Sequence, residues 1–409
     1  MHRVVVTGIG GVCALGSDWR GIEAGLRAGR NAVRVMPEWD RYDEMGTRLG
    51  APIPDFALPA HWTRKQLRSM GRVSQLAVRG SEFALADAGL LGDTAIGDGR
   101  MGVACGSSVG STADISDFAQ MLLTGASSGL NANSYVRMMP HTTAANVSIF
   151  FGLTGRMIPT SSACTSASQA IGYAYEAVSS GRQAMMLAGG AEEMCPSAAM
   201  AFDLLYATSR RNDAPALVPQ PYDRDRDGLV VGEGAGMLVL ETLDGARSRG
   251  ARIHAEIAGF ASNCDGTHVT RPREETMRRV MAAALDDAGI APAQVGYVNG
   301  HGTATEHGDI AETQATSKLF GPRMPISSQK SYLGHTMGAC GALEAWITIA
   351  GLRDGWFPPT LNLRNVDPRC GELDYVSGSG RNIDTEYAVS NNFAFGGVNT
   401  SLVLRRWAP

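Results

Sequence analysis

Short runs of apolar residues alternate along the whole chain with stretches in which apolar residues recur at helical spacing. The apolar runs predict buried strands at 3–7, 101–104, 184–188, 237–240, 254–260, 295–299, 388–392 and 401–405. Helical spacing predicts helices at 74–88, 165–179, 275–288 and 342–352. Strands that alternate with helices in this way predict an α/β fold.

The segment 246–251, Ala-Arg-Ser-Arg-Gly-Ala, is the best candidate for a seam, because a strand pattern restarts just after it. We therefore predict an N-terminal half of residues 1–250 and a C-terminal half of residues 251–409. The patterns of the two halves are loosely similar, although their residues do not repeat.

Composition narrows the class of protein. The chain has 409 residues, of which 44% are hydrophobic and 19% charged, as in ordinary globular proteins. A net charge of −4 argues against a general nucleic-acid binder. No apolar run is long enough for a membrane span, and the start lacks a signal-peptide pattern. The seven cysteines are scattered and include no CxxC pair. This pattern predicts a protein of the reducing cytoplasm and argues against a disulfide framework or a structural zinc site.

Cys164 ends a run of small residues within 158–171, and a helical pattern begins directly after it. The spacing predicts a thiol at a helix N-terminus, where the helix dipole stabilises a thiolate and lowers the pKa of the thiol. A thiolate is the reactive form of cysteine in nucleophilic catalysis. The alternative is a small buried cysteine packed between strand and helix, and this motif alone leaves both open.

Two histidines with glycine neighbours favour the nucleophile. His301 follows the predicted strand 295–299, and His335 precedes a run of small residues that predicts a tightly packed helix. Glycine at such turns allows the backbone to approach a ligand closely. A lone histidine is more often a polar residue of the core, but two of them combined with Cys164 indicate a catalytic set.

The three motifs resemble those of the elongating β-ketoacyl-acyl-carrier-protein synthases, type II ketosynthases of the thiolase superfamily. The resemblance runs from 4–10, Val-Val-Val-Thr-Gly-Ile-Gly, to 390–399, Ser-Asn-Asn-Phe-Ala-Phe-Gly-Gly-Val-Asn. The combination of one cysteine with two histidines is typical of the elongating branch. The resemblance implies a thiolase-like fold of five αβαβα layers, built from two pseudo-equivalent halves with mixed sheets. The first half would carry Cys164 and the second both histidines.

The resemblance also implies a reaction, the decarboxylative Claisen condensation of a malonyl group with an acyl group on Cys164. Both substrates would arrive on the phosphopantetheine arm of acyl carrier protein, and neither a metal nor a bound cofactor would be needed. His301 and His335 would donate hydrogen bonds to the malonyl thioester oxygen.

Further roles follow from the same resemblance, residue by residue. The N–H groups of Cys164 and Phe395 would form the oxyanion hole, with Phe395 also gating the acyl pocket, although Ala394 and Val398 replace a usual glycine and threonine of that loop. The other implied roles are support of the active site by Lys330, Glu344, Asp309 and Glu312, pantetheine binding by Thr270, Thr303 and Thr305, an acyl pocket at Val109, Met138 and Phe202, and carrier docking by Lys65, Arg68 and Arg271, with Arg273 beside it.

Structural interpretations and alternative functions remain open for these motifs. From the pattern alone, the basic turn that holds Lys65 and Arg68 is by default a solvated face. Surface salt bridges are an equally good interpretation of Asp309, Glu312, Lys330 and Glu344. The segment 7–13 resembles a dinucleotide-binding loop, but Cys13 replaces its third glycine. A non-catalytic partner subunit is disfavoured because the nucleophile is present. A cysteine hydrolase is disfavoured because it would need one base, not two separate histidines.

Five segments look unlike those of fatty-acid enzymes and resemble the ketosynthase subunit of bacterial aryl polyene pathways; they are 37–43, 137–143, 202–209, 211–213 and 370–375. In that family a cysteine-less chain length factor pairs with the catalytic subunit. We therefore expect a dimer, either a homodimer or a heterodimer with such a factor. Ordinary fatty-acid elongation is the rival function.

Overall fold

The computed structural model describes residues 1–408. Its longer strands are β1 (Val4–Cys13), β4 (Met101–Gly106), β5 (Met157–Thr160), β6 (Met185–Glu192), β8 (Gly234–Thr242), β9 (Ala255–Cys264), β10 (Val295–Asn299), β11 (Pro325–Ser327), β15 (Tyr387–Ala394) and β16 (Val398–Arg406). The short strands are β2 (Arg34–Val35), β3 (Leu49–Ala51), β7 (Val231–Gly232), β12 (Trp356–Phe357), β13 (Asp374–Tyr375) and β14 (Arg381–Asn382).

The α-helices are α1 (Trp19–Arg27), α2 (Arg64–Leu67), α3 (Arg72–Asp87), α4 (Thr112–Thr124), α5 (Ala132–Met138), α6 (Thr142–Phe151), α7 (Ser166–Ser179), α8 (Pro196–Asp203), α9 (Leu243–Ser248), α10 (Glu274–Ala288), α11 (Glu306–Phe320), α12 (Lys330–Leu333) and α13 (Cys340–Asp354). Two short 3₁₀ turns, η3 (Ala163–Thr165) and η6 (Met337–Ala339), lead directly into α7 and α13.

Eleven strands form one hydrogen-bonded sheet in the order β13-β11-β10-β15-β16-β9-β1-β8-β6-β4-β5. The strand order repeats on the two sides of the β1–β9 pair. One set is β1, β4, β5, β6 and β8, and the other is β9, β10, β11, β15 and β16. When each set is numbered from 1 to 5 along the chain, both have the order 3-2-4-5-1 from the outer side of the sheet to its middle. The pairing has the same directions in both sets, parallel at the outer strands and antiparallel near the middle.

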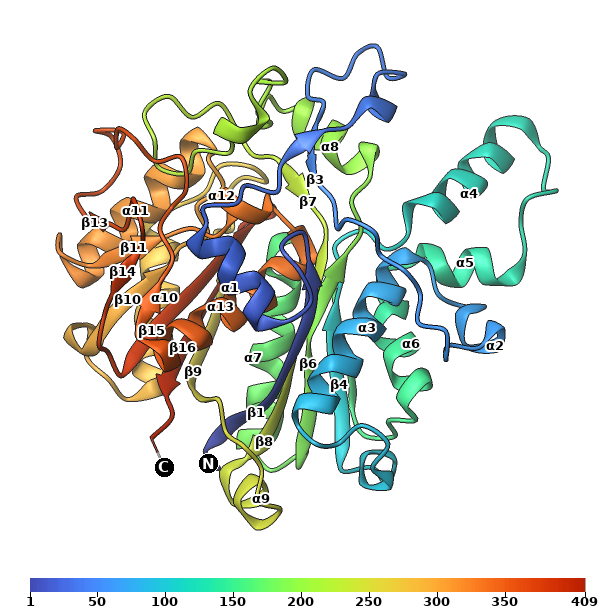
Figure 1. Cartoon of the computed structure of the whole chain (residues 1–409), viewed down its shortest axis with the longest axis horizontal. Helices are drawn as coiled ribbons and strands as arrows, with labels where there is room; N and C mark the ends of the chain where they lie inside the picture. Colours follow the sequence, from blue (N-terminus) through green and yellow to red (C-terminus); the bar gives the residue numbers. More distant parts are fainter. Residues whose placement is uncertain (409) are drawn as a thin grey trace.

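The helices complete five layers (Figure 1). Helices α7 and α13 lie between the two parts of the sheet, α3 and α6 cover the outer face of one part, and α10 and α11 cover the other. The central layer is apolar, with Ile171 of α7 and Ile349 of α13 in one buried cluster with Leu238, Ile257 and Leu402 of the strands. The predicted α/β fold with two similar halves is therefore confirmed, while the division at residue 250 stays a prediction.

Each predicted helix and strand lies within or next to an observed one, and the largest difference is in β1. The sequence predicts a strand at 3–7, whereas β1 continues to Cys13 through the glycine-rich segment. A Cβ on Gly8 or Gly10 would overlap the main chain of Ala84 in α3. These glycines serve close helix–strand packing, so the segment is structural and leaves no room for a phosphate.

Among the helices of residues 1–408, none is both long and apolar enough to cross a bilayer.

Candidate active site

Three loops bring the predicted catalytic side chains together. Cys164 lies in η3, His301 follows β10, and His335 comes two residues before η6. The Cys164 Sγ lies 2.9 Å from His335 Nε2, and the two imidazole rings lie 5.2 Å apart at 85°. All three side chains are buried. A thiol and two imidazoles from distant parts of the chain therefore face one point.

A cavity of about 520 Å³ leads from the surface to this point. Thr270, Thr303, Thr305 and Arg271 line it, and so do Phe202, Phe395 and Glu312. The lining does not include Val109, Met138, Lys65 or Arg68. Val109 and Met138 are partly buried elsewhere, and Lys65 and Arg68 lie exposed at α2. Their roles stay predictions.

The backbone at Cys164 is shaped for exposure of the sulfur to the cavity. Ala163 has a φ of 51°, a left-handed conformation that a non-glycine residue adopts at some cost. The main-chain N–H groups of Cys164 and Phe395 lie close enough to the sulfur to favour its thiolate form, and their role as an oxyanion hole stays a prediction.

The pKa of the Cys164 thiol differs from the one that the sequence predicts. Burial raises its pKa to about 12, although the Lys330 ammonium and the two N–H groups oppose the rise. The helix end alone was expected to lower the pKa, and that expectation is wrong because desolvation of the thiolate outweighs the dipole. The resting residue is therefore a thiol.

His335 is held in one tautomer by the main chain. Its Nδ1 accepts a hydrogen bond of 3.2 Å from the N–H of Met337. Burial, together with the nearby Lys330 charge, lowers its pKa well below the usual value, so the imidazole is neutral at neutral pH. A neutral ring that accepts at Nδ1 carries its proton on Nε2. That N–H therefore points at Cys164 and at the end of the cavity.

His301 is positioned through its main chain by Glu312. The N–H groups of His301 and Gly302 donate to the two Glu312 oxygens at 2.6 and 2.7 Å. Burial raises the pKa of Glu312 to about 8. Burial also lowers the pKa of His301 well below the usual value, with help from Lys330 and His335. Both histidines are thus neutral hydrogen-bonding groups.

Lys330 and Glu344 form a fully buried ion pair behind the histidines. The Lys330 charge acts on Cys164, His301 and His335 alike. The other Glu344 oxygen accepts a 2.8 Å hydrogen bond from Asn392 Nδ2. Burial leaves no room for the interpretation of these residues as surface salt bridges.

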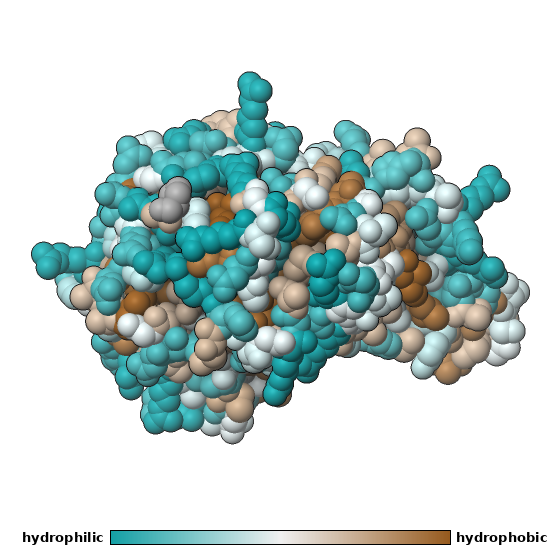
Figure 2. Space-filling view, turned by 90° about the horizontal axis from the view of Figure 1, so that it is seen from below, coloured by the Kyte–Doolittle hydropathy of each residue, from teal (hydrophilic) through white to brown (hydrophobic). Residues whose placement is uncertain are grey.

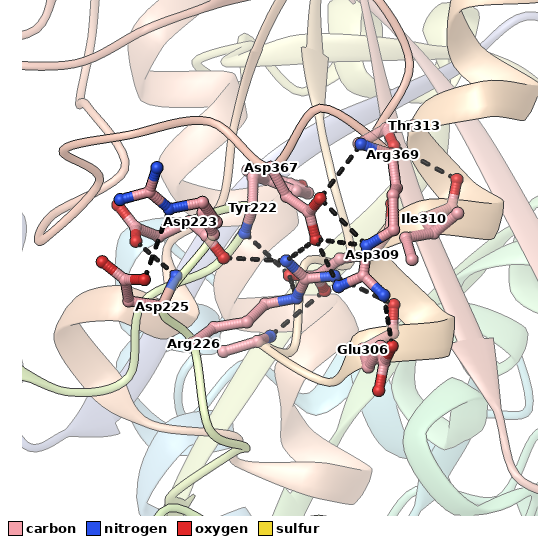
Figure 3. A network of polar contacts seen from close by, with 12 residues as sticks. Tyr222, Asp223, Asp225, Arg226, Glu306, Asp309, Ile310, Thr313, Asp367 and Arg369 are labelled. Carbon is pink, nitrogen blue, oxygen red and sulfur yellow. Dashed lines mark hydrogen bonds and ion pairs between the residues drawn. The ribbon is translucent and has the colours of Figure 1, made fainter.

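A second buried network holds the loop that follows His301 (Figure 3). The Arg226 guanidinium lies between Asp367, at 2.7 Å, and Asp309, at 3.5 Å. Asp309 accepts hydrogen bonds from the N–H groups of Tyr222 and Ala304. Burial raises the pKa of Asp309 to about 6 in spite of Arg226. Asp309 thereby fixes the turn that presents Thr303 and Thr305 to the cavity.

Phe395 lies on the β15–β16 turn, between Ala394 and two glycines with left-handed backbones. Its ring lies 5.2 Å from that of Phe202, which is in turn 6.5 Å from His335. The two phenyl rings therefore form an aromatic wall beside the reacting point. The role of Phe395 as a gate stays a prediction.

Two domain models of the β-ketoacyl synthases match the chain. The N-terminal domain matches residues 1–246 and the C-terminal domain residues 254–364. The chain belongs to the β-ketoacyl synthase family.

Relatives of this synthase match it along nearly the whole length. The 3-oxoacyl-[acyl-carrier-protein] synthase 2 of Synechocystis is 36% identical over 411 residues, which covers 99% of this chain and 98% of the relative. The crystal structure of a β-ketoacyl synthase from Burkholderia phymatum is 62% identical, with a TM-score of 0.99 over 100% of both chains. The ishigamide ketosynthase/chain length factor is 32% identical, with a TM-score of 0.91 over 100% of both chains. The synthase is an enzyme of the acyltransferase class with a thiolase-like fold.

The synthase brings together atoms that metals also use. Cys164, His301 and His335 each offer one such atom within 4.8 Å of the other two, and His301, Cys340 and Glu344 form a similar group. The Lys330 ammonium pairs with Glu344 and acts on all three residues of the first group. The positive charge of Lys330 would therefore repel a metal cation at these atoms.

Sequence reasoning missed three residues that shape the site. Glu192, at the end of β6, is buried and accepts hydrogen bonds from the N–H groups of Ser108 and Gly338. Arg226 and Asn392 were missed as well. Asn392 had a signal, because two consecutive asparagines within an apolar strand pattern require buried partners.

Proposed function

We propose that the synthase catalyses the decarboxylative condensation of malonyl carrier protein with an acyl group held on Cys164. The observation that carries this proposal is the meeting of one buried thiol with two neutral imidazoles at the end of a single cavity. A hydrolase would need one base, whereas two neutral donors suit the stabilisation of an enolate.

In the first half-reaction, the Cys164 sulfur attacks the thioester carbonyl of an acyl carrier protein. The tetrahedral oxyanion is held by the N–H groups of Cys164 and Phe395. The carbonyl–pantetheine bond breaks, and the thiol proton ends on the departing pantetheine sulfur. Because the pKa of Cys164 is raised, the N–H of His335 at 2.9 Å helps to stabilise the sulfur as it becomes charged.

In the second half-reaction, the bond between the malonyl carbon and its carboxylate breaks and carbon dioxide leaves. The electron pair forms an enolate, whose oxygen accepts hydrogen bonds from His301 and His335. The enolate carbon attacks the acyl carbonyl on Cys164 and expels the sulfur, which then takes a proton from solvent. The product is a β-ketoacyl carrier protein, two carbons longer.

We place the carrier protein at the mouth of the cavity, beside Arg271. The exposed Lys65 and Arg68, which lie outside the cavity lining, are the further docking residues of this proposal. Charge reversal of Lys65 and Arg68 to glutamate should raise KM for carrier-bound substrates about tenfold, because charge steers the association of acidic partners. Small acyl thioesters should react as before. The matched control is Arg20→Glu, an exposed arginine on α1 outside the cavity lining. Equal loss on both kinds of substrate, or equal loss in the control, would remove the docking role.

For the acyl group we propose an aryl polyene. The aromatic pair Phe202 and Phe395 supports this choice, since a flat conjugated chain can stack on phenyl rings. The second candidate is fatty-acid elongation, which the full-length match to 3-oxoacyl-[acyl-carrier-protein] synthase 2 favours. A cytoplasmic location is part of either proposal.

The two candidates differ in which acyl group loads and elongates. The synthase is offered aryl-polyenoyl and saturated acyl carrier proteins, with and without a cysteine-less homologue, and intact mass follows Cys164. Preferential aryl-polyenoyl loading, with elongation dependent on the homologue, supports the polyene function. Efficient elongation of saturated chains by the synthase alone supports the fatty-acid function. Fast thioester hydrolysis without malonyl donor would contradict both.

We further propose that the synthase dimerises through its Cys164-bearing half. Strand β5 is the free edge of the sheet, and its Met157 is 47% exposed. Leu122 and Leu123 of α4 and Ile149 of α6 are also exposed. Figure 2 shows hydrophobic side chains on the right of the underside, the side on which Figure 1 places α4, α5 and α6. Such an apolar edge suits a second copy or a homologous chain length factor.

A further inference from the structure

Asn392 lies behind the active site, on β15, and does not line the cavity. Its side chain is fully buried. The amide nitrogen Nδ2 lies 2.8 Å from Glu344 Oε2, 3.4 Å from His301 Nδ1 and 3.5 Å from Cys340 Sγ. One amide group therefore contacts both the buried ion pair and a proposed catalytic histidine.

Glu344 decides which way this amide points. Its carboxylate pairs with the Lys330 ammonium and can only accept hydrogen bonds. A flipped amide would place Asn392 Oδ1 against that carboxylate, with two acceptors in contact and no proton between them. Nδ2 must therefore face Glu344, and its second hydrogen is available to His301 Nδ1 at 3.4 Å and, more weakly, to Cys340 Sγ at 3.5 Å.

The contact has a consequence for His301, because a neutral imidazole carries one proton and accepts at the other nitrogen. A donor at Nδ1 leaves the proton on Nε2. His335 has the same tautomer, but there the donor at Nδ1 is the main-chain N–H of Met337. For His301, Asn392 Nδ2 is the hydrogen-bond partner of Nδ1.

We propose that Asn392 is a positioning residue that sets the tautomer of His301, so that Nε2–H can donate to the malonyl thioester oxygen. This inference rests on the proposed function. Lys330 orders Glu344, Glu344 orients Asn392, and Asn392 selects the proton-bearing nitrogen of His301. Acyl transfer to Cys164 does not use this proton, so the two half-reactions should respond differently when Asn392 changes.

The test is Asn392→Asp. Two buried carboxylates in contact share one proton, which leaves an aspartate oxygen facing His301 Nδ1. That oxygen accepts, so the imidazole proton moves to Nδ1 and Nε2 can no longer donate. Malonyl decarboxylation should fall about 10²–10³-fold, the usual cost of one lost oxyanion donor. Loading of Cys164, followed by intact mass, should change less than about threefold.

Two further variants keep the test decisive if that protein does not fold. Asn392→Leu is of similar size and cannot donate, so it should slow decarboxylation about tenfold and spare loading. Asn391→Asp is the matched control: Asn391 is the preceding residue of β15, equally buried, and contacts Met281 instead of the histidine. Its ratio of decarboxylation to loading should equal that of the wild type.

¹⁵N spectra of histidine-labelled protein read the tautomer directly. Wild type should show His301 protonated at Nε2, and Asn392→Asp should show it protonated at Nδ1. An unchanged tautomer, or an equal fall of loading and decarboxylation in both Asn392 variants, would overturn the inference. A wild-type protein that neither loads nor decarboxylates would instead refute the proposed function, while the spectra would still decide the role of Asn392.

Discussion

The two loops that lead into the central helices are built alike and used differently. In η3 the first residue, Ala163, has a φ of 51°, and in η6 the first residue, Met337, has a φ of 43°. Each loop has three residues and continues directly into α7 or α13. In this alignment Cys164 corresponds to Gly338. The same backbone thus presents a nucleophile in one half and no side chain in the other.

The neighbours of the two positions explain the difference. The Cys164 sulfur faces the cavity. A Cβ on Gly338 would instead lie 2.7 Å from Glu192 Oε2 and 2.8 Å from the main-chain nitrogen of Ser108. Glu192 also accepts a hydrogen bond from the Gly338 N–H. The repeated fold therefore supplies two equivalent loops at the start of α7 and α13. One carries the proposed nucleophile, and the other packs against Glu192 and the 107–108 backbone.

The largest effect should come from removal of the side chain that distinguishes the two loops. Cys164→Ala should lower condensation by at least about 10⁴-fold, because no other group can hold the acyl chain. Malonyl decarboxylation should survive, since the two histidines remain. The control is Cys105→Ala, because Cys105 is as buried and burial also raises its pKa to about 12. Condensation retained in the Cys164 variant would refute the assignment of the nucleophile.

A methyl group on the other loop should show that Gly338 is a packing position. Gly338→Ala forces Glu192 or the 107–108 backbone to move, which should lower the free energy of unfolding by about 1–3 kcal/mol. Urea denaturation measures this change. Gly21→Ala is the control, because a Cβ there meets only ordinary contacts and should change stability by less than about 1 kcal/mol. Equal stability of both variants would mean that the two loops differ for some other reason.

The last prediction depends on pH and concerns Glu312, the acid that holds the main chain of His301. Glu312 has an ordinary pKa of 4.5 and a folded pKa of about 8. The folded protein therefore favours the protonated form, and this stabilisation is full below about pH 4.5 and is lost as pH rises to about 8. Between these limits the stability of the wild type relative to Glu312→Gln should fall by roughly 5 kcal/mol, at about 1.4 kcal/mol for each pH unit. A difference that does not vary with pH would contradict the raised pKa.

The sequence was sufficient for the parts of the site that rest on motifs. Cys164 before a helical pattern and two glycine-flanked histidines predicted the three side chains that meet. The alternation of strands and helices predicted the class of fold. Strand β1 was cut short because glycine usually marks a turn, whereas Gly8 and Gly10 lie in the strand, where α3 packs against it.

Other features depend on contacts between distant segments, which no local pattern records. The repeat of the halves lies in strand order, so comparison of their residues could not find it. The rise in the pKa of Cys164 comes from burial by the whole fold. Asn392 acts on His301 from a strand 91 positions away in the chain. Val109 and Met138 were assigned by resemblance, and the cavity of one chain does not reach them.

The central claim is that one enolate oxygen meets both His301 and His335 while Cys164 faces the neighbouring carbon. A crystal structure of the synthase with a non-hydrolysable malonyl carrier mimic tests it most directly. We predict that the thioester oxygen lies within hydrogen-bond distance of a ring nitrogen of each histidine. An oxygen bound instead by the N–H groups of Cys164 and Phe395, with the histidines empty, would contradict the account.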